Sequence, residues 1–151
     1  MSASTGDLHE QAADRLGSVA QRYTQGRRAI VDVLASAERP LTVPEMLTVA
    51  PPGAIPQSSA YRNLAVLIEA QVVRRLAGND EFARYELAED LAGHHHHLLC
   101  DNCGLVTDVD APEALEEAVA EAARLAAAQG GFQVTSHRMD LVGRCADCVE
   151  A

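Results

Sequence analysis

The segment that most restricts what this chain can become is HHHHLLCDNC, residues 94–103, in which four consecutive histidines lead into a Cys-x-x-Cys pair. A second such pair, Cys145 and Cys148, stands close to the C-terminal end. Two residues between cysteines allow both sulfurs to face one point, and two pairs together make the tetrahedral all-thiolate site that zinc favours. We therefore expect Cys100, Cys103, Cys145 and Cys148 to hold a structural zinc ion.

Two other uses of paired cysteines fit this chain less well. A disulfide framework is typical of small secreted chains, whereas this sequence shows no secretory signal and is long enough to build a core without covalent cross-links. A redox dithiol usually occurs once, after a strand, whereas here two pairs stand far apart. The sequence has neither an apolar run of membrane-spanning length nor a charged-then-apolar leader, so we expect a cytoplasmic protein without a membrane partner. Reduced thiols in the cytoplasm would suit the zinc assignment.

The four histidines need a separate interpretation. If residues 94–100 are extended, successive side chains point to opposite faces. His94 and His96 would then serve one site, and His95 and His97 another. Each pair needs further ligands, and carboxylates or a distant histidine are the usual complement. His137 is one candidate, although an ordinary half-buried histidine is an equally good interpretation of that position.

The charge is distributed unevenly along the chain. A net charge of −10 argues at first against a nucleic-acid partner. However, residues 15–75 contain eight arginines and four acidic residues, whereas residues 88–151 contain three arginines and twelve acidic residues. A basic half suits a polyanionic partner and an acidic half suits metal cations. We therefore expect two domains, residues 1–88 and 94–151, joined by a hinge at residues 89–93.

Hydrophobic spacing in the N-terminal half predicts helices followed by a hairpin. Residues 1–14 fit either a mobile tail or the start of a helix, and a weakly amphipathic helix is expected over 12–23. The pattern then predicts a helix over 27–37. A capping box at 42–45 then opens a helix to about residue 49, a further helix covers 58–70, and strands cover 72–77 and 82–87 around a turn at 78–81. Setting the weak helix aside, three helices and a hairpin are the order of a winged helix.

The last helix of this half begins with the sequence SSAYRN. In a major groove, arginine can pair with guanine and asparagine with adenine, and tyrosine or serine can hold phosphate or a methyl edge. Taken alone, the segment fits an ordinary solvated helix face better. The surplus of arginine in this half favours DNA, and the expected contacts are Ser59, Tyr61, Arg62, Asn63 and Arg27.

The C-terminal half reads as a small α/β unit. Strands are expected at 94–100 and 105–109, an alanine-rich helix at about 113–129, and a last strand at 132–143 that delivers the second cysteine pair. So few elements give a thin core, and such a unit would gain from pairing with a copy of itself. The expected fold is therefore α+β, with a winged-helix DNA-binding domain followed by a small α/β dimerisation domain that carries the four-cysteine zinc site.

The order of these features resembles the ferric uptake regulator family of bacterial metal-dependent repressors. The resemblance runs from about Arg22 to Cys148, and it rests on Tyr85-Glu86-Leu87, HHHHLLCDNCG, Ser136-His137, the closing cysteine pair and SSAYRNLAVL, which is similar to the family's recognition helix. It implies a homodimer that binds palindromic double-stranded DNA operators when a regulatory metal is loaded. It also implies that Tyr61 and Arg62 are the DNA-contacting pair.

The resemblance also implies ligand sets, residue by residue. The sensing site would contain Glu86, His95 and His97. A further site would contain His94, His96, His137 and a helix carboxylate, for which Glu116 is our choice and Glu113 or Glu117 are the alternatives.

This chain departs from the family pattern at one ligand position. Many members supply a histidine ahead of the third helix, whereas here that place holds Arg39-Pro40-Leu41. Glu81, Asp90 and His9 are candidate substitutes. Because all four cysteines are committed, the sensing site offers only nitrogen and oxygen ligands, which suit Fe2+ or Zn2+, with Mn2+ as a further option beside the structural Zn2+.

Three other functions are alternatives. The first is an enzyme in which a His/Glu zinc site with an open position activates water for hydrolysis. Because the sequence contains neither an H-E-x-x-H motif nor a nucleophile elbow, we expect neither an enzyme nor a small-molecule substrate. A zinc-ribbon module that binds protein is a second alternative. A third, within the same family, is a peroxide-sensing regulator that works by metal-catalysed histidine oxidation.

Overall fold

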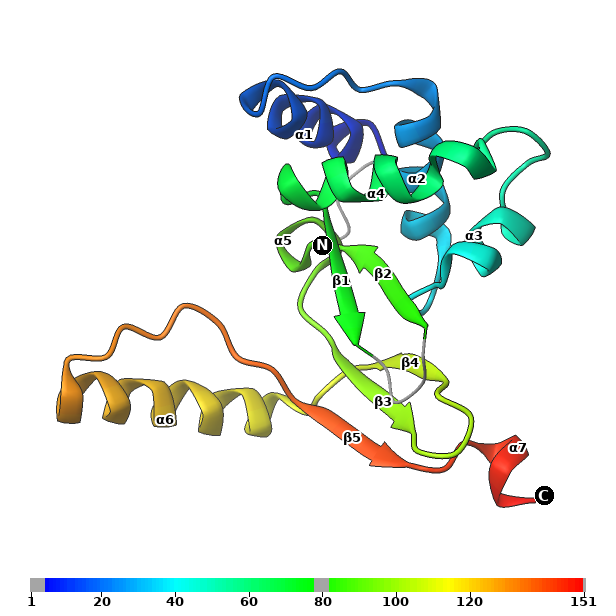
Figure 1. Cartoon of the computed structure of the whole chain (residues 1–151). Helices are drawn as coiled ribbons and strands as arrows, with labels where there is room; N and C mark the ends of the chain where they lie inside the picture. Colours follow the sequence, from blue (N-terminus) through cyan, green and yellow to red (C-terminus); the bar gives the residue numbers. More distant parts are fainter. Residues whose placement is uncertain (1–4, 78–81, 151) are drawn as a thin grey trace.

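The computed structural model describes residues 5–77 and 82–150. Helices and a two-stranded hairpin form the N-terminal half, and a three-stranded sheet with one long helix forms the C-terminal half (Figure 1). The N-terminal elements are α1 (Thr5–Ser18), α2 (Gln25–Ser36), α3 (Val43–Val49), the 3-10 turn η1 (Gln57–Ser59), α4 (Ala60–Glu69), β1 (Val73–Ala77), β2 (Ala83–Leu87) and α5 (Glu89–Ala92). The C-terminal elements are β3 (His96–Cys100), β4 (Val106–Val109), α6 (Glu113–Gly130), β5 (Asp140–Gly143) and α7 (Ala146–Val149).

Side-chain caps fix where two of the N-terminal helices begin. The Thr24 hydroxyl accepts a hydrogen bond from the backbone N–H of Arg27, at 3.4 Å, and starts α2. Ahead of α3, Thr42 and Glu45 form a reciprocal capping box, in which the Glu45 carboxylate accepts from the Thr42 N–H at 2.7 Å. Pro44 lies in the first turn, where a backbone N–H would have no partner within the helix, and proline has no such N–H. The capping box expected from the sequence is thus confirmed.

The core of the N-terminal half lies between α2, α4 and the hairpin. Ile30, Leu64, Leu67 and Val72 are all at most 1% exposed. Burying an aliphatic side chain of this size contributes about 1.5–3 kcal/mol, so this cluster holds the helices on the antiparallel β1–β2 pair. The winged-helix fold is confirmed, whereas the turn expected at residues 78–81 lies outside the described residues.

The leading helix differs from the expectation. We expected a mobile tail or a helix start over residues 1–14 and a helix over 12–23. The helix α1 starts at Thr5, which agrees with the second alternative, and ends at Ser18, earlier than expected. Leu8, Ala12 and Leu16 recur every four residues on its buried face, so this segment supplies the first core contact. Ala20 has a positive φ of 57°, which is incompatible with a helix continuing through it.

The segment expected to be a hinge contains one helical turn, α5. Leu91 in this turn is 9% exposed and belongs to the N-terminal core. Asp90 pairs with Arg15 of α1 at 2.5 Å. The segment is therefore attached to the winged helix on its buried side, and the division into residues 1–88, 89–93 and 94–151 stays a prediction.

The C-terminal sheet has the strand order β4–β3–β5. β3 is antiparallel to β4, with His97 opposite Asp108, and parallel to β5, with His97 opposite Asp140. The last strand is shorter than expected, because residues 132–139 have no regular secondary structure and β5 begins only at Asp140. Alternation of apolar residues made that segment look like a strand, but alternation alone does not supply a pairing partner.

Helix α6 extends away from the sheet, as Figure 1 shows. None of its residues is buried, and Leu125 is 51% exposed. β5 is also open, with Leu141 and Val142 at 53% and 62% exposure. Within the described ranges, no helix combines the length and apolar character needed to cross a membrane.

Candidate metal centre

The four cysteines come together as expected from their spacing. Cys100 ends β3 and Cys103 lies in the turn after it, while Cys145 caps α7 and Cys148 lies within it. All four are free thiols, their sulfurs lie within 4.8 Å of one another, and the Cys103 and Cys145 sulfurs are 3.7 Å apart. Backbone N–H groups of Cys103 and Cys145 donate to the Cys100 sulfur and lower its pKa to about 6. Four converging sulfurs, one of them favoured as thiolate, fit a closed zinc site.

A second group of ligand atoms lies where the hairpin meets the C-terminal sheet. We call it the wing cluster, and its members are Glu86, His95, His97 and Asp108. Glu86 Oε2 is 3.0 Å from His95 Nε2 and 3.1 Å from His97 Nε2. Asp108 Oδ1 is 3.8 Å from His95 Nε2 and 3.9 Å from His97 Nε2. Two imidazoles and two carboxylates thus converge within 4.8 Å, a donor set that fits Fe2+, Mn2+ or Zn2+.

The imidazoles of the wing cluster have the orientation that a metal ligand needs. His95 Nδ1 is 2.9 Å from the Gly93 carbonyl oxygen, which can accept the Nδ1 proton in a hydrogen bond. A metal ion at the cluster would then take the place of the Nε2 proton and use the Nε2 lone pair. His97 Nδ1 is 3.5 Å from Asp140 Oδ1 on β5, which supports the same tautomer. Backbone and strand neighbours therefore hold both rings with Nε2 facing inward.

Electrostatics keeps the wing cluster ready to accept a cation. Burial raises the pKa of Glu86, but hydrogen bonds from His97 and His95 and the charge of Arg74 outweigh it and bring this pKa down to about 2. Burial and the charge of Glu86 raise the pKa of Asp108. Two carboxylates held this close repel each other, and a divalent cation between them would relieve that repulsion.

A third group, the helix cluster, contains His94, His96, Glu116 and His137. Glu116 Oε1 is 2.6 Å from His96 Nε2, and Glu116 Oε2 is 3.3 Å from His94 Nε2 and 3.0 Å from His137 Nε2. Hydrogen bonding from His96 lowers the pKa of Glu116. Glu116 is the carboxylate that α6 contributes to this cluster, and the alternatives Glu113 and Glu117 lie outside it.

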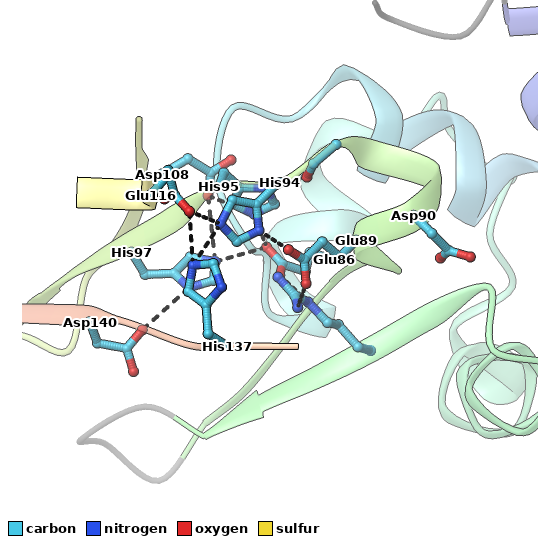
Figure 2. A network of polar contacts seen from close by, with 12 residues as sticks. Glu86, Glu89, Asp90, His94, His95, His97, Asp108, Glu116, His137 and Asp140 are labelled. Atoms are coloured by element: carbon cyan, nitrogen blue, oxygen red, sulfur yellow. Dashed lines mark hydrogen bonds and ion pairs between the residues drawn. The ribbon is translucent and has the colours of Figure 1, made fainter. Parts of the chain in front are cut away.

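The histidine run divides between the two clusters as the alternation argument predicts. His94 and His96 lie with His137 and Glu116 of α6, whereas His95 and His97 lie with Glu86. Figure 2 shows His94 beside His137. β3 itself starts only at His96, so the first two histidines precede the strand. The ligand roles of these residues stay a prediction, but their placement brings all seven expected histidine and carboxylate ligands into two compact groups.

Asp108 is the ligand candidate that the sequence reasoning missed. Within the described residues, it lies beside Glu86, His95 and His97, where two of the three expected substitutes do not. Asp90 is paired with Arg15, His9 is held by Tyr23 and Asp32 at 2.6 and 2.8 Å, and Glu81 lies outside the described residues. Asp108 lies opposite His97 across β3 and β4. Pairing the two expected strands as an antiparallel hairpin around the first cysteine pair would have placed Asp108 opposite His97.

The expected DNA contacts fall into two groups. Tyr61, 64% exposed, and Arg62, also exposed, lie in the first turn of α4, where a groove could receive them. In contrast, Arg27 and Asn63 are bound to each other, with Arg27 Nε donating to Asn63 Oδ1 at 3.3 Å. Ser59 lies just ahead of α4, half-buried, and its hydroxyl is 3.4 Å from Asn63 Nδ2. Arg27, Asn63 and Ser59 therefore brace the start of the helix.

Together the fold and the three clusters define a winged-helix protein with metal centres. Residues 18–142 match the model of the ferric uptake regulator family, and the chain belongs to that family. Members of this family are transcription regulators rather than enzymes. The chain is 30% identical, over 142 residues and 92% of each sequence, to the peroxide operon regulator of Bacillus subtilis.

Solved structures show the same fold. The ferric uptake regulator of Helicobacter pylori matches 99% of this chain and 97% of its own, with a TM-score of 0.76 at 22% identity. A zinc-bound manganese uptake regulator matches 91% of this chain and 98% of its own, with a TM-score of 0.62 at 28% identity.

Proposed function

We propose that this chain is a metal-dependent repressor of metal homeostasis genes that binds palindromic operators as a homodimer when the wing cluster is loaded with Fe2+ or Zn2+. The protein would act in the cytoplasm. A bound ion would supply a fixed positive charge and directed bonds to all four side chains of the cluster. The proposal extends the family assignment to specific residues and to a specific control step.

One observation carries the proposal. Glu86 belongs to β2, the second strand of the wing, whereas His95 and His97 lie just before and within β3 and Asp108 lies on β4. Glu86 is 7% exposed and is the side chain that the described part of the wing contributes to this cluster. Residues of the winged helix and of the C-terminal sheet therefore share one site. Filling it would fix the position of α4 relative to the sheet, and so the distance between the two recognition helices of a dimer.

The cysteine cluster would have a different task. Its sulfurs join the turn after β3 to the C-terminal end of the chain, so zinc there would close the C-terminal unit on itself. Structural zinc in small domains carries on the order of 10–16 kcal/mol of apparent binding free energy. We propose that it contributes to folding and dimerisation, and that it is not exchanged during regulation.

Selection of operators from a pool of random duplexes tests the proposal. Protein with a zinc-filled cysteine cluster would select duplexes in the presence of Fe2+, Mn2+ or Zn2+, and binding of the enriched sequence would be followed by fluorescence anisotropy. We expect palindromic sequences and an affinity that rises about 5- to 150-fold with metal. Equal affinity with and without each ion, or no enriched duplex, would refute it.

A peroxide-responsive repressor is the second candidate. The similarity to the Bacillus subtilis peroxide operon regulator favours it. His95 and His97 would be the targets, since both imidazoles would contact iron at the wing cluster. Hydrogen peroxide would transfer one oxygen atom to an imidazole carbon and leave as water. Mass spectrometry after treatment with Fe2+ and peroxide should then show one added oxygen on a peptide containing residues 94–97, and no addition when Mn2+ replaces iron.

A further inference from the structure

Arg74 lies between the wing cluster and the helix cluster and belongs to neither. It is on β1, opposite Glu86 in the hairpin register. Its Nε and Nη2 groups donate to Glu86 Oε1, and its Nη1 is 3.5 Å from Glu89 Oε2. One guanidinium therefore contacts two carboxylates, and each of these carboxylates contacts different histidines.

Each of these carboxylates uses its second oxygen for a histidine. Glu86 Oε2 faces His95 and His97 in the wing cluster. Glu89 Oε1 accepts a hydrogen bond from His94 Nδ1, which leaves His94 Nε2 directed at the helix cluster (Figure 2). A continuous chain of polar contacts thus runs from one cluster to the other, with Arg74 at its midpoint.

We propose that Arg74 is a positioning residue shared by both metal clusters, which aims Glu86 at the wing cluster and, through Glu89, aims His94 at the helix cluster. The inference rests on the proposed function, since it requires that both clusters bind metal. Arg74 belongs to neither ligand set, yet it would affect the metal affinity of both clusters.

The geometry requires an arginine. A guanidinium offers donors in a planar fork and can hold two carboxylates at once, whereas a lysine ammonium is a single point charge on a flexible stem. Arg74 is also a cation, and a cation near a metal site repels the ion. Because two carboxylates flank it and its side chain is 28% exposed, solvent and counter-charge screen this repulsion. Loss of an outer-shell partner typically weakens metal binding about 10- to 100-fold. We therefore expect positioning to outweigh repulsion.

Site-specific affinities for Mn2+ test the proposal. The free ion is followed by its electron paramagnetic resonance signal, in full-length protein whose cysteine cluster is filled with zinc. A His96→Ala background isolates the wing cluster, and a His97→Ala background isolates the helix cluster. Arg74→Gln, Arg74→Lys and Glu89→Gln are introduced into each background. Arg75→Gln is the matched control, because it removes the same charge from the neighbouring, exposed position of β1.

Arg74→Gln should weaken Mn2+ binding by about tenfold at each cluster, and Arg75→Gln should change neither. Glu89→Gln should weaken Mn2+ binding at the helix cluster alone. At that cluster, the double variant Arg74→Gln/Glu89→Gln should lose less affinity than the product of the two single losses. Arg74→Lys should lose affinity in at least one cluster. If Arg74→Gln does not fold, Arg74→Lys and Glu89→Gln still provide the test.

Tighter binding in Arg74→Gln, with Arg74→Lys equal to wild type, would overturn the proposal, because it would show that Arg74 acts by charge alone. Unchanged affinity at both clusters would also overturn it. Failure of the proposed function looks different. In that case neither His96→Ala nor His97→Ala would remove one equivalent of bound Mn2+ from the otherwise wild-type chain.

Discussion

Replacing His97 with alanine separates metal sensing from folding. His97 is 6% exposed, and its Nε2 lies 3.1 Å from Glu86 and 3.9 Å from Asp108. Removing one of four proposed ligands should cost more than removing an outer-shell partner, so we expect at least about 100-fold weaker binding at the wing cluster. At an ion concentration about ten times the wild-type Kd, occupancy then falls from about 90% to about 10%, and most of the metal-dependent gain in operator affinity, about 5- to 150-fold, disappears.

The neighbouring residue provides the control. His96→Ala removes the same kind of side chain from the opposite face of the strand, where it contacts Glu116 at 2.6 Å. We expect this variant to keep its metal-dependent operator binding and to lose one equivalent of bound ion. Fluorescence anisotropy titrations of both variants against Mn2+ measure the difference. A His97→Ala protein that responds to metal as strongly as wild type would show that the wing cluster does not control DNA binding.

Three further outcomes are expected. Cys103→Ser should give misfolded or monomeric protein, seen by circular dichroism and sedimentation, because one of four zinc ligands is lost. Arg62→Ala should weaken operator binding in the presence of metal while leaving Mn2+ affinity unchanged. The pKa of His94 is raised by Glu89, and that of His95 is raised by Glu86 against the effect of burial. Protonation of these rings therefore stabilises the fold below pH 6.5, the ordinary histidine pKa, and this stability is lost as pH rises through the raised values. The melting temperature of protein without metal at the wing and helix clusters should fall over that range, and added Mn2+ should remove the fall because the ion replaces the protons.

The histidine division could be predicted because it depends only on local geometry. Extended backbone sends neighbouring side chains to opposite sides, so the assignment of His94 with His96 and of His95 with His97 needed no knowledge of the fold. The cysteine cluster was predictable for a similar reason, since the spacing within each pair sets the direction of both sulfurs. In both cases a short stretch of sequence contains the geometric information.

Asp108 could not be found in that way, because its role depends on the register between β3 and β4. A shift of one residue would have sent it to the other face of the sheet. The start of α1 was left open because Leu8, Ala12 and Leu16 are separated by polar residues that fit a tail as well as a helix. The strand expected from residue 132 was too long because an alternating pattern shows which face is apolar but not whether another strand lies alongside.

The exposed helix α6 and the open face of β5 have a consequence for how the protein responds to its own abundance. If these surfaces are covered only by a second copy, unfolding becomes a bimolecular equilibrium. A tenfold dilution then lowers the free energy of unfolding per pair by about 1.4 kcal/mol. Chains at low concentration would then dissociate even with metal bound, so genes under their control would be released by low expression as well as by starvation for metal.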